Sequence, residues 1–415
     1  MNYKEIFEKV KIASRSISGL GEEKINQIIL RLAEIVEKET PRLIAENEKD
    51  LGRMDPSNPL YDRLKLTPER ISGIASDLRH VASLPSPVGE EIESRILPNG
   101  ILLRRVRVPF GVIGVIYEAR PNVTFDVFSL CLKSGNACIL KGGKDAEDSN
   151  REAIRLIHQA LEEAGVSKDV AVLLPSTHEA TGELLNAVGN VDVCIPRGGR
   201  RLIDFVRDNA RVPVIETGAG VVHLYFDATA DMKMGKDILL NAKTRRVSVC
   251  NALDTLLIHR DRLSELPDLV AGLAGKNVAL YADDTTFREL EGKYPEELLS
   301  HADDSAWDKE WMDYKMGVKV VDNLDEAIQH ISRHGSGHSE SIVSSDPEAM
   351  RKFQNEVDAA CVYVNLPTSF TDGAQFGLGA EIGISTQKLG PRGPMGLREM
   401  TTYRYLLSGE GQIRP

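Results

Sequence analysis

The sequence predicts an α/β protein with a doubly wound, mostly parallel sheet, followed by a second α/β region. From Phe110 onward, short runs rich in β-branched residues alternate with stretches of helical periodicity, which is typical of βαβ units. A second alternation of the same kind begins near Thr255 and ends near Asn365. The chain has 415 residues, which is enough for about two or three domains.

The first part of the chain, residues 1–90, is expected to be helical. From Ile25 to Val36, isoleucines, leucine and valine recur at the spacing of one helix face. A Pro-Asn-Gly turn signal at 98–100 then precedes a stretch at 101–108 that mixes apolar and basic residues with a strand-like period. This pattern predicts a hairpin arm.

The two alternating regions give the following expected elements. In the first region, strands are expected at 112–117, 137–140, 170–173, 191–195, 212–215 and 221–226, and helices near 122–133, 146–163, 177–187 and 199–209. In the second region, strands are expected at 255–259, 278–281, 318–321, 340–344 and 361–365, and helices at 261–275, 325–333 and 347–356. The glycine-rich tail ends in an expected strand at 401–407.

The composition limits the possible partners and the compartment. The net charge is −11, so a nucleic-acid surface is not expected, and an anionic ligand must meet a local basic cluster. The five cysteines are odd in number and contain no CxxC pair, and no histidines have metal-ligand spacing, so neither disulfides nor a metal site is expected. No signal peptide and no window of roughly 18–20 apolar residues is present, which predicts a cytoplasmic protein that makes no contact with a membrane.

Cys250 is the leading candidate nucleophile. Three cations, Lys243, Arg245 and Arg246, precede it closely in the sequence. Nearby positive charge lowers the pKa of a thiol and favours the reactive thiolate, and the same cations could receive a phosphate group. The alternative is that Cys250 is a small buried hydrophobic residue, which is how the other four cysteines are interpreted.

Two further polar residues follow expected strands. The amide of Asn122 lies at a strand-to-helix junction, where it could polarise a carbonyl, although Asn is also a favoured helix N-cap. Glu216 lies after a strand and before a Gly-Ala-Gly turn, where a capping role is equally open.

Basic and glycine-rich turns suggest a nucleotide site. Lys141 and Lys144 are separated by two glycines and follow an expected strand, and Gly198 lies where a basic turn opens a helix that favours anions. Solvated basic turns explain both patterns equally well, and no GxGxxG fingerprint is present. His338 lies beside a strand of the second region, where a structural histidine is the commoner case.

Several long motifs in the right order resemble the aldehyde dehydrogenase superfamily and, within it, the family of gamma-glutamyl phosphate reductases. The resemblance covers nearly the whole chain from Pro109 to Leu407. It lies in YEARPNVT at 117–124, SVCNAL at 248–253, FTDGAQFGLGAEIGIST at 370–386 and RGPMGL at 392–397. Asn122, Lys141, Glu216 and Cys250 also follow one another in the superfamily's order.

The resemblance implies a reaction. The Cys250 thiolate would attack gamma-glutamyl phosphate, phosphate would leave, and the thioester would accept a hydride from NADPH to give glutamate 5-semialdehyde, the second step of proline biosynthesis from glutamate. Asn122 would hold the oxyanion with the backbone N–H of Cys250. Arg120, Arg245, Arg246 and His338 are expected to contact the substrate or its phosphate.

Cofactor residues are also implied by the resemblance. Superfamily members that prefer NAD often carry Glu three positions after the lysine, and here Lys144 stands there, so NADP(H) is expected. Lys141, Gly198 and Glu216 are expected near the cofactor, although the role of Glu216 is open because a reductase hydrolyses no thioester. The superfamily's nicotinamide-ribose Glu motif is absent, and Asp313 is the expected substitute.

Three parts are expected, by analogy with relatives. A cofactor-binding domain would use residues 1–92 and 109–230, a catalytic domain residues 231–366, and an oligomerisation arm and tail residues 93–108 and 367–415. The arm predicts a homo-oligomer, and a glutamate 5-kinase is a candidate partner that would hand over the acyl phosphate.

Two rival functions stay open from the sequence. One is an oxidative aldehyde dehydrogenase that hydrolyses its thioester with Glu216 as base. The other is a non-catalytic binding or scaffold protein that keeps the fold. Phosphate dependence of the reaction separates the first rival from a reductase, and selective labelling of Cys250 by a thiol reagent separates the second.

Overall fold

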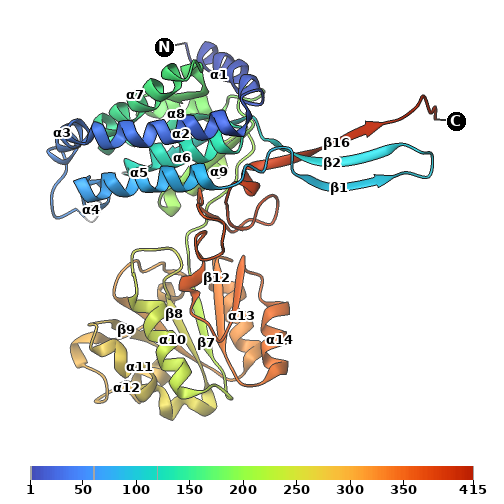
Figure 1. Cartoon of the computed structure of the whole chain (residues 1–415). Helices are drawn as coiled ribbons and strands as arrows, with labels where there is room; N and C mark the ends of the chain where they lie inside the picture. Colours follow the sequence, from blue (N-terminus) through green and yellow to red (C-terminus); the bar gives the residue numbers. More distant parts are fainter. Residues whose placement is uncertain (1, 59–60, 119, 415) are drawn as a thin grey trace. The chain divides into compact units, whose positions relative to one another are not determined.

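The computed structural model describes residues 2–58, 61–118 and 120–414 (Figure 1). The chain divides into two compact units. The first unit contains residues 1–217, 377–383 and 395–415, and the second contains residues 218–376 and 384–394. The second unit therefore begins at Gly218, whereas the sequence placed this boundary at 230/231.

The first unit is built on a four-stranded parallel sheet in the order β5-β4-β3-β6. The strands are β3 (Val112–Tyr117), β4 (Ala137–Lys141), β5 (Ala171–Leu173) and β6 (Val193–Arg197). The helices are α1 (Tyr3–Ile17), α2 (Gly21–Lys38), α3 (Thr40–Leu51), α4 (Tyr61–Leu64), α5 (Pro68–Ser83), α6 (Asn122–Lys133), α7 (Glu147–Glu163), α8 (His178–Leu185) and α9 (Arg200–Asn209). The strands and helices α6 to α9 lie within a few residues of the expected ones, and α1 to α5 lie in the part that was expected to be helical without individual bounds.

Burial explains why these segments fold as they do. Every residue of β3 and β4 is buried, as expected for the middle strands of a parallel sheet covered on both faces. The apolar stripe of α2 that includes Ile25, Ile28 and Leu32 is buried in the same core. One expected strand, 212–215, is reduced to an isolated bridge between Cys194 and Val214. Pro213 has no N–H, so the ladder cannot extend there.

A separate three-stranded antiparallel sheet forms an arm of the first unit. It contains β1 (Glu91–Ile96), β2 (Leu102–Pro109) and β16 (Thr401–Ser408) in the order β1-β2-β16. Figure 1 shows these strands extending away from the helices of their unit. The hairpin expected near 93–108 is present, and the tail strand pairs with it over the whole of β2.

The second unit contains a seven-stranded parallel sheet in the order β10-β9-β11-β8-β7-β12-β13. The strands are β7 (His223–Phe226), β8 (Thr255–His259), β9 (Ala279–Ala282), β10 (Leu299–His301), β11 (Lys315–Val321), β12 (Ser339–Val343) and β13 (Cys361–Val364), and a short pair β14 (Ile384–Ser385) and β15 (Gly393–Pro394) lies apart. The helices are α10 (Met232–Thr244), α11 (Leu266–Ala274), α12 (Asp284–Leu290), α13 (Leu324–His334) and α14 (Pro347–Glu356).

The strand expected at 221–226 was assigned to the wrong part of the chain. It forms as β7, but β7 pairs with β8 and β12 of the second unit. Strand partners are chosen by tertiary packing, and the alternation of elements along the chain carries no mark of where one sheet ends. Among the described residues, no helix combines the length and apolar character that crossing a membrane requires.

Candidate active site

Cys250 lies in a turn between the end of α10 and the start of β8. It is half-buried, whereas the other four cysteines are buried. Helix α10 was not expected from the sequence, although its buried positions Ile238, Leu239 and Ala242 repeat with helical spacing. The side chain of Asp231 caps its first turn by accepting from the N–H of Met234. The helix therefore gives the cysteine loop a fixed starting point.

Gly220 packs directly against the backbone of Cys250. A Cβ at position 220 would lie 1.6 Å from the carbonyl oxygen of Cys250 and 3.2 Å from its Cα, so any side chain there would displace the cysteine. The N–H of Gly220 donates to Oε1 of Glu310 at 3.1 Å. Neither residue was predicted as a site residue, and the glycine pair at 218 and 220 was the available signal in the sequence.

Hydrogen bonds hold the residue after Cys250 as well. Asn251 is buried, and its side-chain N–H donates to the carbonyl oxygen of Thr371 at 2.9 Å. The backbone carbonyl of Asn251 accepts from the hydroxyl of Thr368 at 2.8 Å. The motif at 370–386 therefore supports the cysteine loop through Thr371.

His338 joins the same support instead of reaching a surface. Its side chain is fully buried, and its Nδ1 lies 2.8 Å from the hydroxyl of Ser339, which in turn lies 2.6 Å from the hydroxyl of Thr371. Burial lowers the pKa of His338 to about 4, so the imidazole is neutral near pH 7. A neutral, enclosed histidine is suited to supporting the loop and not to meeting an anion directly.

The basic cluster before Cys250 contains two exposed cations, not three. Arg245 and Arg246 are exposed, and neither forms an ion pair within the described ranges. Lys243 is fully buried, and its ammonium group donates to the carbonyl oxygen of Leu253 at 2.8 Å. Burial lowers the pKa of Lys243 to about 8, with Asp254 opposing that shift. Lys243 is thus a structural residue, and its buried ammonium group is not available to a phosphate.

The strand order gathers these residues at one edge of the second sheet. Gly220 precedes β7, Cys250 precedes β8, and Glu310 and Asp313 precede β11. These three strands are neighbours in the sheet, in the order β11-β8-β7. Because the strands are parallel, their amino ends meet at the same edge. Asp313 is exposed and forms an ion pair with Lys315 at 2.9 Å, which holds its pKa below the usual value.

In the first unit, Asn122 is the first residue of α6 and its amide is directed by a carboxyl group. Nδ2 of Asn122 donates to Oδ2 of Asp126 at 2.9 Å. Burial, and then the neighbouring charge of Asp77, raise the pKa of Asp126 to about 7. The exposed Arg120 acts on the same carboxyl in the opposite direction. Asp126 was not predicted as a site residue, although it lies one helical turn after Asn122.

The carboxyl edge of the first sheet carries the expected cofactor residues. Lys141 is the last residue of β4, is buried, and has a pKa that burial lowers. Lys144 is exposed at the start of the next turn. A pocket of about 320 Å³ begins at Gly142 and Gly143, and apolar side chains from β5 and α7 line it together with polar and charged ones. Cationic groups beside a partly apolar pocket suit the phosphates and ring of a nucleotide.

Two expected cofactor positions are already engaged by protein groups. At the start of α9, the N–H of Gly199 donates to the carboxylate of Glu118 at 2.9 Å, and a Cβ at Gly198 would lie 2.5 Å from the same carboxylate. The helix start near Gly198 is therefore occupied by an internal anion. Glu216 is half-buried and lies 3.7 Å from the guanidinium of Arg207. Both contacts lie within the first unit.

Proteins of known family resemble the chain over its full length. No protein-family model matches the chain. The chain is 56% identical to the gamma-glutamyl phosphate reductase of Parabacteroides distasonis and 57% identical to that of Bacteroides thetaiotaomicron, with at least 99% of each chain covered. A solved structure of the gamma-glutamyl phosphate reductase of Thermotoga maritima is 39% identical, with full coverage of both chains and a TM-score of 0.95.

A more distant structure shows the breadth of the fold. An acetylating aldehyde dehydrogenase from Geobacillus thermoglucosidasius shares only 17% identity but has a TM-score of 0.70 over 100% of this chain and 97% of its own. This likeness supports the aldehyde dehydrogenase-like α/β fold that the motifs implied. The full-length relatives above 50% identity carry the closer assignment, and the chain therefore belongs to the gamma-glutamyl phosphate reductase family.

Proposed function

We propose that this chain reduces gamma-glutamyl phosphate to glutamate 5-semialdehyde with NADPH and releases phosphate. Family membership supports the reaction, and one structural observation carries the assignment of the nucleophile. Cys250 alone among the five cysteines is not buried, and its backbone is held by Gly220. A reactive thiol must be reachable and fixed in position, and Cys250 meets both requirements.

In the first step, the Cys250 thiolate attacks the acyl carbon and forms a C–S bond. The C–O bond to phosphate breaks, and the phosphate takes the bonding electron pair. Arg245 and Arg246 are exposed cations just before the cysteine and would attract the acyl phosphate against the net charge of −11. The amide of Asn122, directed by Asp126, is proposed to donate to the carbonyl oxygen.

NADPH would supply the hydride that converts the thioester to a thiohemiacetal. The residues of the first unit fit this cofactor, because Lys141 and Lys144 flank the glycines that open a partly apolar pocket. Lys144 would attract the 2′-phosphate that distinguishes NADPH from NADH. We do not assign the pyrophosphate to the helix start at Gly198, because Glu118 occupies the N–H of Gly199 there.

The last step releases the product and restores the thiol. The thiohemiacetal loses its hydroxyl proton, the C–S bond breaks, and the sulfur leaves with the electron pair as a thiolate. Asn122 would again hold the oxygen as its charge changes. The support that Thr368 and Thr371 give to Asn251 would keep the sulfur in place between the two halves of the reaction.

The reverse reaction provides the test. NADP reduction is measured with glutamate semialdehyde, with and without phosphate, for the parent and for Cys250→Ser. We expect strict phosphate dependence in the parent and a loss of about a thousandfold or more in the variant. Cys361→Ala, which changes a buried cysteine of the same unit, should retain most of the activity. Turnover without phosphate would favour the oxidative aldehyde dehydrogenase. Loss of that phosphate-independent turnover on substitution of Glu216 would identify Glu216 as the base.

We further propose a homo-oligomer in the cytoplasm. The five cysteines are free, in agreement with a reducing compartment. The sheet of the arm has only three strands, and it exposes apolar and aromatic side chains. Its open edges and this exposed surface favour pairing with a second copy of the chain. The acyl phosphate is labile, so a glutamate 5-kinase that docks to deliver it is the proposed partner.

A further inference from the structure

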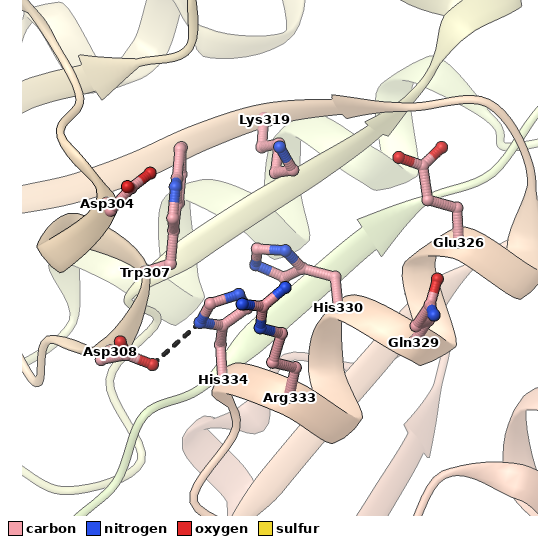
Figure 2. Close-up of a pocket in the computed structure, with 9 residues that line it drawn as sticks. All are labelled: Asp304, Trp307, Asp308, Lys319, Glu326, Gln329, His330, Arg333 and His334. Atoms are coloured by element: carbon pink, nitrogen blue, oxygen red, sulfur yellow. Dashed lines mark hydrogen bonds and ion pairs between the residues drawn. The ribbon is translucent and has the colours of Figure 1, made fainter.

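A groove of about 570 Å³ lies in the second unit, apart from the candidate active-site residues. It lies between the short helix η5 (Asp304–Asp308) and α13, beside β11. Figure 2 shows the side chains that line it, and none of them has a role in the proposed reaction. The volume is within the range of sites for small molecules.

A buried histidine, His330, is among the residues that line this groove, and one of its ring nitrogens has no hydrogen-bond partner within the described ranges. His330 is 7% exposed, and its Nε2 has no partner among the described residues. The ring makes contacts with other rings, edge-on to Trp307 at 5.7 Å and tilted toward His334 at 4.5 Å. Leaving a buried polar nitrogen unpaired is unfavourable, so its retention needs a reason.

Two cations without ion-pair partners flank His330. Within the described part of the chain, Lys319 and Arg333 form no ion pair, and the ammonium of Lys319 lies 5.3 Å from the Trp307 ring centre. Burial is the largest cause that lowers the pKa of His330 to about 2, and the charges of His223, His334, Lys319 and Arg333 all act in the same direction. Both cations of the groove therefore act on His330.

In the described part of the chain, none of the carboxylates that line the groove forms an ion pair with Lys319 or Arg333. Asp308 is bound to His334 at 2.8 Å, and Glu326 accepts from the N–H of Asp322 at 2.6 Å. In Figure 2, Asp304 and Glu326 lie at opposite ends of the groove, with His330 and Arg333 in its middle. The groove thus has cations at its centre and carboxylates at its ends. This arrangement suits a ligand that has an anionic group for the centre and hydroxyl groups that donate to the carboxylates.

We infer that this groove binds a phosphorylated small molecule, with its phosphate on Lys319 and Arg333 beside His330. Guanidinium and ammonium groups are the usual phosphate ligands, and an Arg can hold two phosphate oxygens at once. The acidic ends can accept from sugar hydroxyls. Free phosphate and the phosphate of a nucleotide share this chemistry, and the experiment separates them. The inference does not depend on the proposed reaction.

Tryptophan fluorescence can report on this groove directly. The chain has two tryptophans, so Trp311→Phe leaves Trp307, which lines the groove, as the single reporter. This variant is titrated at constant ionic strength with inorganic phosphate, with adenosine 5′-monophosphate, and with succinate as a dianion that carries no phosphate. A saturable change with a phosphate-bearing compound is expected, and a lower Kd for the nucleotide would assign the organic source.

Further substitutions in the Trp311→Phe background decide whether the groove is the binding site. Arg333→Gln and Lys319→Gln should each weaken binding by about tenfold or more, because each removes a charged ligand of the phosphate. Arg288→Gln, an arginine of the same unit outside the groove, should leave Kd unchanged. The double change Arg245→Gln and Arg246→Gln should also leave it unchanged, which excludes a signal from the candidate active site. An absent response, an equal response to succinate, or an equal Kd in Arg333→Gln and the parent overturns the inference.

Discussion

At the scale of single residues, the site depends on close contacts that fix a few atoms. Gly220 has no side chain because the Cys250 carbonyl occupies the space where a Cβ would lie. Asn122 is directed by Asp126, and Asn251 by the segment at 368–371. The side chains in these contacts are common ones, and they suit a reaction only because the contacts hold them in fixed positions.

Gly220→Ala tests the contact with Cys250. The added methyl group must push the cysteine loop aside, so we expect activity to fall by about a hundredfold or more and stability to fall by about 1–3 kcal/mol. The measurements are semialdehyde-dependent NADP reduction and urea unfolding. Gly272→Ala is the matched control, since its new Cβ would meet Leu240 at an ordinary 3.7 Å. Full activity in Gly220→Ala would contradict the proposed packing constraint.

Asp126→Asn tests the raised pKa of the carboxyl behind Asn122. The pKa of Asp126 rises from 3.8 to about 7 on folding, so the folded state binds this proton more tightly than the unfolded state. This carboxyl therefore makes the parent lose stability as pH rises from about 4 to 7, with no further loss above. The variant lacks this slope, and its advantage in Tm over the parent should grow across that window. A pH-independent difference in Tm would show that Asp126 titrates normally.

Lys144→Glu tests the choice of cofactor. A carboxylate there would repel the 2′-phosphate and could accept from ribose hydroxyls, so kcat/KM for NADPH should fall by about tenfold or more relative to NADH. Steady-state kinetics with both cofactors measure the ratio. Lys168→Glu changes another exposed lysine of the same unit and should leave the ratio unchanged. An unaltered ratio in Lys144→Glu would remove Lys144 from the cofactor site.

At the scale of elements, sheet edges collect the functional residues. Parallel strands place Lys141 and the start of α6 at the carboxyl edge of the first sheet, and place Gly220, Cys250 and Glu310 at the amino edge of the second. In the arm, by contrast, apolar and aromatic side chains are exposed on the sheet. Its antiparallel strands have few buried side chains, and Tyr403, Tyr405 and Leu407 are about half-exposed or more. Such a surface is costly unless another chain covers it.

Replacing Tyr405 and Leu407 by arginine tests the arm as an oligomer contact. The two side chains project from the same face of β16 because their spacing is two. We expect a smaller assembly by light scattering after size exclusion, with little change in the near-ultraviolet spectrum of the folded units. Leu389→Arg, which alters an exposed leucine of the second unit, should not change the mass. An unchanged mass in the double variant would exclude this face as the contact.

At the scale of the whole molecule, two units with separate apolar cores share the proposed chemistry. The first unit carries the candidate nucleotide pocket and Asn122, and the second carries Cys250 and its cations. The net charge of −11 makes local clusters decisive, because an anionic substrate meets attraction only where cations are unpaired. Arg245 and Arg246 meet that condition within the described ranges, as do Lys319 and Arg333 in the groove.

Most helices and strands were predictable from the amino-acid sequence, because the period of apolar residues decides whether a segment can bury one face. The sequence also identified the reductase family, and with it Cys250 and Asn122 as candidates, from motifs that are local in the chain. The tertiary structure alone decided that Lys243 is buried away from the other cations, that β7 belongs to the second sheet, and that Glu118 occupies the helix start at Gly198. Each of these depends on residues apart in the chain that packing brings together, and no local pattern records which of them will meet.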